Sequence, residues 1–358
     1  MGQIVITEVV IPMTLDAPDA DEFLACVAVR NAANQHDAGS NDLDYSAEEL
    51  LPGWQKTTFE PKRMLSARLD GRLVARGVYE TRTDDAADTV WLFMEVLPDA
   101  RGHGVGLALG HHMEEMARAE GKTRAIAYAP SWKRGGIRIP SPTGFGSVPA
   151  GTPEVRLLQS LGYTLEQVER GSRMTLPLEP GVLEGVRDAA REHAPYDAFR
   201  VHTWIDATPD EWREDIAHLL TRMSTDAPSA GLEEPEDVWS VERLVEDERF
   251  EEESPRTALT TAVEHVASGR LVGFTELTVP VETERPVSQE DTLVLREHRG
   301  RRLGTLLKSE NLLFLERVRP GHPSVITYNA EENRHMLDVN EALGFVPFVY
   351  EGAWRHTL

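Results

Sequence analysis

The chain has 358 residues, of which 41% are hydrophobic and 27% are charged, a composition typical of folded globular proteins. This length predicts two domains, each large enough to bury a core of its own. The net charge of −23 argues against a nucleic-acid partner, because phosphate contacts need clustered lysine and arginine. The single cysteine, Cys26, excludes an intramolecular disulfide and a cysteine-based zinc cluster, and we expect no bound metal.

The sequence also argues against a membrane protein. No stretch approaches the roughly 18 consecutive apolar residues that a membrane-spanning helix needs. The N-terminal letters MGQIVITEVVIPMTL lack the basic start and the long apolar run of a signal peptide. We therefore expect a cytoplasmic protein.

The predicted elements, in chain order, form one series twice. The first series runs from Ile4 to about Leu178 and includes a long loop over 130–152, which is rich in glycine, proline and serine. A segment with Pro180, Gly181 and Pro195 follows, and a short helix is predicted there at 182–193. We therefore predict an N-terminal domain at 1–180, a linker at 181–198 and a C-terminal domain at 199–358.

The second series is easier to read from its hydrophobic pattern. Strands are predicted at 199–205, 256–266, 271–279, 291–295, 324–329 and 345–354. Helices are predicted at 210–226, from about Pro235 to Glu252, at 303–317 and at 333–343.

Two separate segments show that the chain contains an internal duplication. DARGHGVG at 99–106 corresponds to EHRGRRLG at 297–304, and Gly-Arg-Leu-Val at 71–74 recurs at 269–272. The offset is 198 positions in both cases. Downstream, Leu-Gly-Tyr at 161–163 corresponds to Leu-Gly-Phe at 343–345, so the first copy carries an insertion, which we assign to the 130–152 loop.

Each copy places an arginine- and glycine-rich turn between a strand and a long helix. Glycines let the backbone approach a phosphate closely, and the free amides at the start of the helix point toward it. A dinucleotide-binding fingerprint would open a parallel strand–helix–strand unit, whereas this turn follows three consecutive strands. No lysine follows the glycines as in a nucleotide-binding P-loop.

These turns resemble the signature of the GNAT acetyltransferase superfamily, Arg/Gln-x-x-Gly-x-Gly/Ala, which binds the pyrophosphate of coenzyme A. VLPDARGHGVGLAL (96–109) fits with Arg101, Gly104 and Gly106, and VLREHRGRRLGTLL (294–307) fits except that Arg302 replaces the middle glycine. NAEENRHMLDVNEALGF (329–345) resembles the downstream part of the family pattern. The resemblance implies an α+β chain of two tandem GNAT domains, each a twisted mixed sheet flanked by helices, as in actinobacterial two-domain members of the superfamily.

The resemblance also implies acetyl-coenzyme A as co-substrate and a set of residues that contact it. In the first copy these are Val96, Arg101, Gly102, His103, Gly104, Val105 and Gly106. In the second copy they are Leu295, Arg299, Gly300, Arg301, Arg302, Leu303, Gly304, Thr305, Asn329 and Asn333. Asn333 also suits the cap of a helix.

We expect the second copy to be the catalytic one, and the first to stabilise the pair or to hold coenzyme A without turnover. Amine acetylation needs a base, for which Glu276 is the first choice and Asp291 the second. The family's usual tyrosine is replaced by Asn340 here and by Leu158 in the first copy, so Tyr328 is the candidate proton donor. A bulky residue at Gly304 is expected to weaken cofactor binding in the second copy, and one at Gly106 in the first.

The sequence therefore predicts an acetyl-coenzyme A-dependent N-acetyltransferase that acts on a primary amine of a small molecule by direct transfer, as a monomer or homodimer. Two alternatives stay open. One is acetylation of lysine in a peptide or protein, and the other is a non-catalytic sensor or scaffold that binds coenzyme A.

Overall fold

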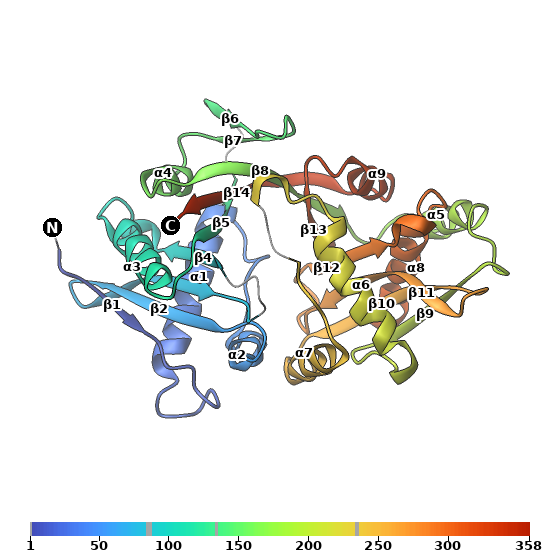
Figure 1. The fold of residues 1–358 in the computed structure, drawn as a ribbon, viewed down its shortest axis with the longest axis horizontal. Helices are drawn as coiled ribbons and strands as arrows, with labels where there is room; N and C mark the ends of the chain where they lie inside the picture. Colours follow the sequence, from blue (N-terminus) through green and yellow to red (C-terminus); the bar gives the residue numbers. More distant parts are fainter. Residues whose placement is uncertain (1, 84–87, 133–134, 233–235) are drawn as a thin grey trace.

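The computed structural model describes residues 2–83, 88–132, 135–232 and 236–358, and Figure 1 shows the two copies side by side with the sheet continuing between them. The first copy comprises β1 (Ile4–Glu8), α1 (Asp21–Ala38), α2 (Ala47–Gln55), β2 (Lys62–Leu69), β3 (Arg72–Glu80), β4 (Thr89–Val96), α3 (Val105–Ala119), β5 (Arg124–Ser131), α4 (Pro153–Ser160) and β8 (Thr164–Thr175).

The second copy repeats this order after a connecting helix, α5 (Val182–Arg191). Its elements are β9 (Phe199–Ile205), α6 (Arg213–Asp226), α7 (Val241–Glu253), β10 (Thr257–His265), β11 (Arg270–Val279), β12 (Val287–Val294), α8 (Leu303–Val318), β13 (Ser324–Ala330), α9 (Arg334–Ala342) and β14 (Val346–Thr357). The predicted duplication is therefore confirmed element by element. Pro235, where one predicted helix begins, lies outside the described residues.

The insertion of the first copy is more ordered than the sequence predicts. Part of the expected loop at 130–152 forms a small hairpin of β6 (Arg138–Pro140) and β7 (Ser147–Pro149). The glycines of this segment bend the chain between and beside the two strands, because Gly144 and Gly146 have positive φ angles that favour glycine. Residues 133–134 of the predicted loop lie outside the described part.

Helices cover both faces of each half of the sheet. In the first copy, Phe23 of α1 packs with Met64 and Val78 on one face, while Leu109 of α3 packs with Leu65 on the other. This alternation is what a strand buried on both faces requires, since successive side chains point to opposite sides. The second copy has the same layers, with α6 and α7 on one face and α8 on the other.

The final strands of the two copies are exchanged. Among the described residues, twelve strands form one sheet in the order β1-β2-β3-β4-β5-β14-β8-β13-β12-β11-β10-β9. β14, at the C-terminal end of the second copy, pairs with β5 of the first, and β8 of the first copy pairs with β13 of the second. β8 and β14 pair with each other at the centre, where Glu169 lies opposite Glu351. Each copy is therefore completed by a strand of the other.

In each copy, two neighbouring parallel strands pair over only a few residues and then move apart. β4 pairs with β5 only at Thr89, Val90 and Trp91, although β4 continues to Val96. β12 pairs with β13 only at Val287 and Ser288. The edges that face each other beyond these points carry backbone groups without a strand partner, which are available to a ligand.

Candidate active site

The first arginine- and glycine-rich turn is held in place by Arg101. Its Nε donates to the carbonyl oxygen of Val96 at 3.0 Å, and its two terminal nitrogens donate to Asp37 of α1 at 2.7 and 2.8 Å. Gly102 and Gly104 have φ angles of 80° and 83°, a left-handed region that favours glycine. Helix α3 begins at the next residue, so its first amides are directed out of the turn.

The second turn has the same architecture, except that one glycine is replaced by Arg302, whose backbone conformation is less favourable. Arg299 donates to the carbonyl oxygen of Val294 at 2.9 Å and to Asp226 of α6 at 2.8 Å. Arg302 occupies the place of Gly104 and has a φ angle of 54°, a conformation that costs a residue with a Cβ atom roughly 1–2 kcal/mol. In both copies the guanidinium group clamps the turn to the first helix, so the amides are left as the groups that face a ligand.

A large cavity begins at the first turn. Its volume is about 640 Å³, and its walls include Arg101, Gly102, Gly104, Val105 and Gly106 together with the separated parts of β4 and β5. We call it the main cavity. It continues across the boundary between the copies to Ser288, Gln289, Glu290, Ile326, Thr327, Tyr328 and Glu351. The cavity is therefore built from both copies.

A second cavity of about 310 Å³ is lined by residues of α6 and by Asp291 of β12. We call it the junction cavity. Glu290 and Asp291 are neighbours in sequence but line different cavities, and β12 contains a bulge at this point. Thr275 of β11 is opposite Thr292 and Leu277 is opposite Gln289, so two residues of β12 face the single residue Glu276.

The structure places the three candidate catalytic residues, Glu276, Asp291 and Tyr328, apart from one another. Tyr328 lines the main cavity and Asp291 lines the junction cavity. Glu276 lines neither cavity and accepts a hydrogen bond from Thr260 at 3.3 Å. Burial, followed by the charges of Glu290 and Asp291, raises the pKa of Glu276 to about 8.

The predicted cofactor residues of the two copies are also placed differently. Val96 and five residues of the first turn line the main cavity, whereas His103 is exposed. None of the predicted residues between Leu295 and Thr305 lines either cavity. Leu295 and Leu303 pack in the apolar core of the second copy.

The two asparagines predicted to contact the cofactor, Asn329 and Asn333, form hydrogen bonds within the second copy. Asn340 donates to Asn329 at 2.7 Å and so ties α9 to β13. Asn333 accepts a hydrogen bond from the amide of Met336 at 3.3 Å and caps α9. The capping alternative for Asn333 is therefore confirmed.

Sequence reasoning missed Glu351, which β14 brings to the main cavity. No hydrogen bond or ion pair joins its carboxylate to another described residue. Burial, followed by the neighbouring charge of Glu169, raises its pKa to about 8. No signal near the turn points to a residue so distant in sequence, because its position depends on the exchanged strand.

Tyr328 lies near this carboxylate. Burial, followed by the charge of Glu351, raises the pKa of the Tyr328 phenol above its usual value. The phenol is therefore protonated at neutral pH and can donate a proton. Glu290 is a third acidic group of the same wall.

Comparison with known proteins identifies this arrangement. Residues 31–133 match the model of the acetyltransferase (GNAT) family. A tandem GNAT protein from the clavulanic acid biosynthesis pathway is 21% identical, covers 99% of this chain and 98% of its own, and has a TM-score of 0.72. The chain has a tandem GNAT fold.

Two further structures are similar in fold. A GCN5-related N-acetyltransferase from Sphaerobacter thermophilus is 16% identical over 99% of this chain and 95% of its own, with a TM-score of 0.63. A glucosamine N-acetyltransferase region of a fungal multi-domain GH3 β-N-acetylglucosaminidase is 14% identical over 99% of this chain and 38% of its own, with a TM-score of 0.60. None of the curated proteins compared with the sequence matches it.

The family match supports N-acetyltransferase activity, and its residues lie in the first copy of the tandem GNAT fold and include the first turn.

Within the described ranges, no cluster of three or more histidine, cysteine, aspartate or glutamate side chains is arranged to hold a metal ion. The helices of the same ranges include none that is long and apolar enough to cross a bilayer.

Proposed function

We propose that this chain is an acetyl-coenzyme A-dependent N-acetyltransferase for a primary amine of a small molecule. The observation that carries the proposal is the main cavity, which joins a phosphate-binding turn to a wall of ionisable side chains. Transfer to an amine needs both features, because the thioester must be anchored and the amine must lose a proton.

The main cavity fits coenzyme A at the first copy. The amides that begin α3 suit the diphosphate, and the gap between β4 and β5 suits the extended pantetheine arm. Bound there, acetyl-coenzyme A supplies an activated acetyl thioester. The unpaired backbone amides along β4 are suitable donors to the thioester carbonyl.

The sequence favours the second copy as the catalytic one, whereas the cavity favours the first. The second turn lines neither cavity, and the hydrogen bond between Asn340 and Asn329 joins the helix and strand that border its cleft. We therefore propose that the first copy holds the cofactor and that the second supplies part of the acceptor site.

Glu351 is our candidate for the base and Tyr328 for the proton donor. A carboxylate with a pKa of about 8 is suited to accept a proton from an ammonium group near neutral pH. Glu276 and Asp291, which the sequence favours, do not line the main cavity. The protonated phenol of Tyr328 can return a proton to the departing thiolate.

The charge of the wall suggests a cationic acceptor. Of the carboxylates that line the main cavity, Asp37 is paired with Arg101 at 2.7 Å and Glu95 with Arg76 at 3.5 Å. Glu154 accepts a hydrogen bond from Ser131 at 3.0 Å. This leaves Glu290 and Glu351 to attract an amine. The net charge of −23 acts in the same direction by steering cations toward the protein.

Calorimetry with acetyl-coenzyme A, followed by measurement of free thiol release against a panel of amines, tests the proposal. We expect one molecule bound per chain and thiol release with one class of small amine. Release only with lysine peptides would favour a protein acceptor. Binding without release for any amine would favour a sensor, and the absence of binding would refute the proposal.

A further inference from the structure

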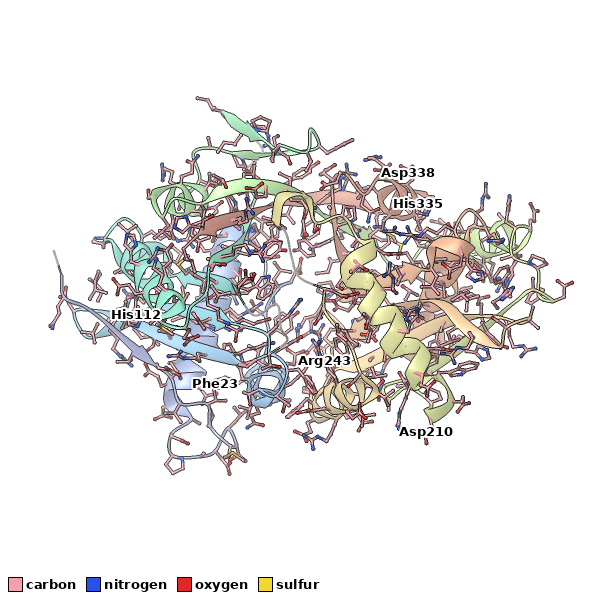
Figure 2. All side chains as sticks on the ribbon, viewed as in Figure 1. Phe23, His112, Asp210, Arg243, His335 and Asp338 are labelled. Atoms are coloured by element: carbon pink, nitrogen blue, oxygen red, sulfur yellow. The ribbon has the colours of Figure 1, made fainter. Side chains whose placement is uncertain are left out.

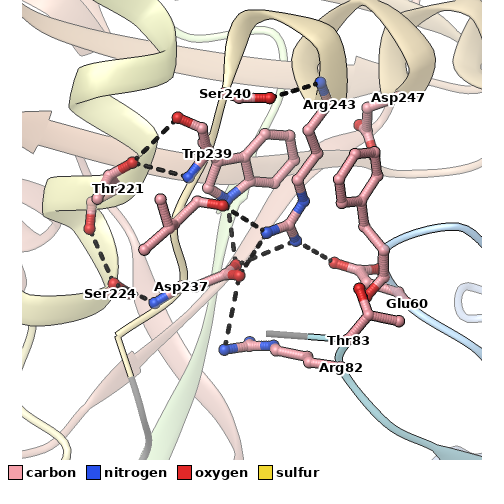
Figure 3. A network of polar contacts seen from close by, with 12 residues as sticks. Glu60, Arg82, Thr83, Thr221, Ser224, Asp237, Trp239, Ser240, Arg243 and Asp247 are labelled. Carbon is pink, nitrogen blue, oxygen red and sulfur yellow. Dashed lines mark hydrogen bonds and ion pairs between the residues drawn. The ribbon is translucent and has the colours of Figure 1, made fainter. Parts of the chain in front are cut away.

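The junction cavity lies where the two copies meet, next to the polar network in Figure 3. Leu220, Met223 and Ser224 of α6 form one wall, and Asp237 and Trp239 precede α7 on another. Asp291 of β12, Arg82 of the first copy and residues 227–229 complete it.

This cavity is the counterpart, in the second copy, of part of the main cavity. Met223 precedes the clamped carboxylate Asp226 by three residues, as Asn34 precedes Asp37. Asp291 precedes Arg299 by eight residues, as Phe93 precedes Arg101. Asn34 and Phe93 both line the main cavity. The duplication has therefore kept a pocket at this place and put a carboxylate where the first copy has a phenyl ring.

The cations around the junction cavity are committed to other partners. Arg243 donates to Asp237 at 2.6 Å and to Glu60 of the first copy at 2.8 Å. Arg82 lies 3.8 Å from Asp237 and 4.7 Å from the centre of the Trp91 ring. Figure 3 shows Asp237 at the centre of these contacts. The charge of Asp237 is thereby balanced.

The charge of Asp291 is not balanced in this way. Within residues 2–83, 88–132, 135–232 and 236–358, no donor or cation lies within bonding distance of its carboxylate. Burial and the charge of Asp237 raise its pKa, which reflects the cost of an unpaired carboxylate in this environment. A cation bound beside Asp291 would remove that cost.

The rest of the wall of the junction cavity is suited to contact the apolar part of a ligand. Leu220, Met223 and Pro228 contribute aliphatic surface, and Trp239 adds an aromatic ring. One face of this ring is stacked by Arg243, whose guanidinium carbon is 4.1 Å from the ring centre. A volume of about 310 Å³ lies near the lower end of the range of small-molecule sites.

We propose that the junction cavity binds a small organic amine, with its ammonium group paired to Asp291 and its apolar part against Met223, Leu220 and Trp239. This site is separate from the main cavity and does not depend on acetyl transfer. The adjacent residue Glu290 lines the main cavity, so an occupant would lie one residue away from the acceptor wall along β12.

Calorimetry on the full chain with benzylamine, and with benzyl alcohol as the uncharged analogue, tests this site. At pH 8 the amine is protonated, and we expect it to bind while the alcohol does not. Asp291→Asn should weaken benzylamine binding at least tenfold, because the variant keeps the shape and removes the charge. Asp210→Asn, which changes an exposed carboxylate, is the matched control and should bind as the unchanged protein does.

Two further variants decide between the cavities. Met223→Trp should abolish benzylamine binding by filling the junction cavity, which makes the test independent of how Asp291→Asn folds. Glu351→Gln, in the main cavity, should leave it unchanged. Binding that survives both Asp291→Asn and Met223→Trp, binding lost only in Glu351→Gln, or no binding to the unchanged protein would overturn the proposal.

Discussion

Lys308 is a buried lysine in the second copy for which the proposed reaction has no use. Its side chain is 1% exposed, and its ammonium nitrogen lies 5.9 Å from the centre of the Phe345 ring. Gly110 holds the corresponding place in the first copy, where a Cβ atom would meet Leu161 at 2.6 Å. The second copy has therefore opened space for a long side chain at this point of the helix packing.

This lysine predicts a specific pH dependence of stability. Burial lowers its pKa from 10.5 to about 7, so between these values the unfolded chain binds more protons than the folded one. The free energy of unfolding should therefore rise with pH from about 7 to about 10.5. Lys308→Met should remove this slope and increase the stability at pH 7 by a few kcal/mol.

Urea unfolding at pH 7 and pH 9.5 measures the effect. Arg317→Met, which removes an exposed cation from the same helix, is the control and should keep the slope of the unchanged protein. Equal slopes in all three proteins would show that the ammonium group is solvated.

Glu351 predicts the pH dependence of catalysis. Because its pKa is about 8 and a base acts when deprotonated, kcat/KM should rise with pH and level off above about 8. Glu351→Gln should lower kcat roughly 100-fold or more and remove this rise, with acetyl-coenzyme A binding unchanged in calorimetry. A variant that keeps the same pH profile would exclude Glu351 as the base.

At the scale of elements, the two turns differ in the space around their last glycine. A Cβ atom at Gly106 would meet Leu157 at 3.0 Å and Val96 at 3.6 Å, whereas Gly304 has nothing within 4 Å. Gly106 also lines the main cavity. Gly106→Val should therefore weaken acetyl-coenzyme A binding at least tenfold, and Gly304→Val should leave it unchanged.

Calorimetric titration of both variants decides which copy holds the cofactor. Thermal unfolding serves as the control that each variant is folded. Loss of acetyl-coenzyme A binding only in Gly304→Val would show that the second copy holds the cofactor, as the sequence predicts.

The elements themselves were largely predictable from the sequence, since hydrophobic period and the paired turns are local signals. The bulge in β12 was not predictable, because it depends on which residues of β11 and β12 pair. It sets Glu290 and Asp291 together opposite Glu276, and of the two only Glu290 lines the main cavity. The position of Glu351 was also not predictable, because the repeat predicts the strand β14 but not that β14 pairs with β5 of the first copy.

At the scale of the whole molecule, the exchanged strands make the two copies one folding unit. Polar contacts add to the connection, with Arg285 of the second copy donating to Glu49 of the first at 2.9 Å and Lys56 pairing with Asp247. Arg170 of β8 donates to Glu331, beyond β13, at 2.8 Å. In Figure 2, Arg243 lies between the two halves of the ribbon.

We expect that the chain cannot be divided into independent halves. Fragments 1–179 and 180–358, separated in the exposed segment before α5, should associate as a 1:1 complex when produced together. Each fragment alone should aggregate or self-associate, because its sheet ends on an unpaired strand edge. Size-exclusion chromatography with light scattering measures this, and two stable monomers would show that β8 can return to its own copy.

The exchange also orders events during synthesis. β5 ends at Ser131 and its neighbour β14 begins at Val346, so the ribosome, adding about 5–20 residues per second, needs at least ten seconds between them. Over that interval the sheet of the nascent first copy lacks β14, so the part of the main cavity that includes Glu351 cannot form. If the proposed function holds, acetyl transfer can begin only after β14 has left the exit tunnel.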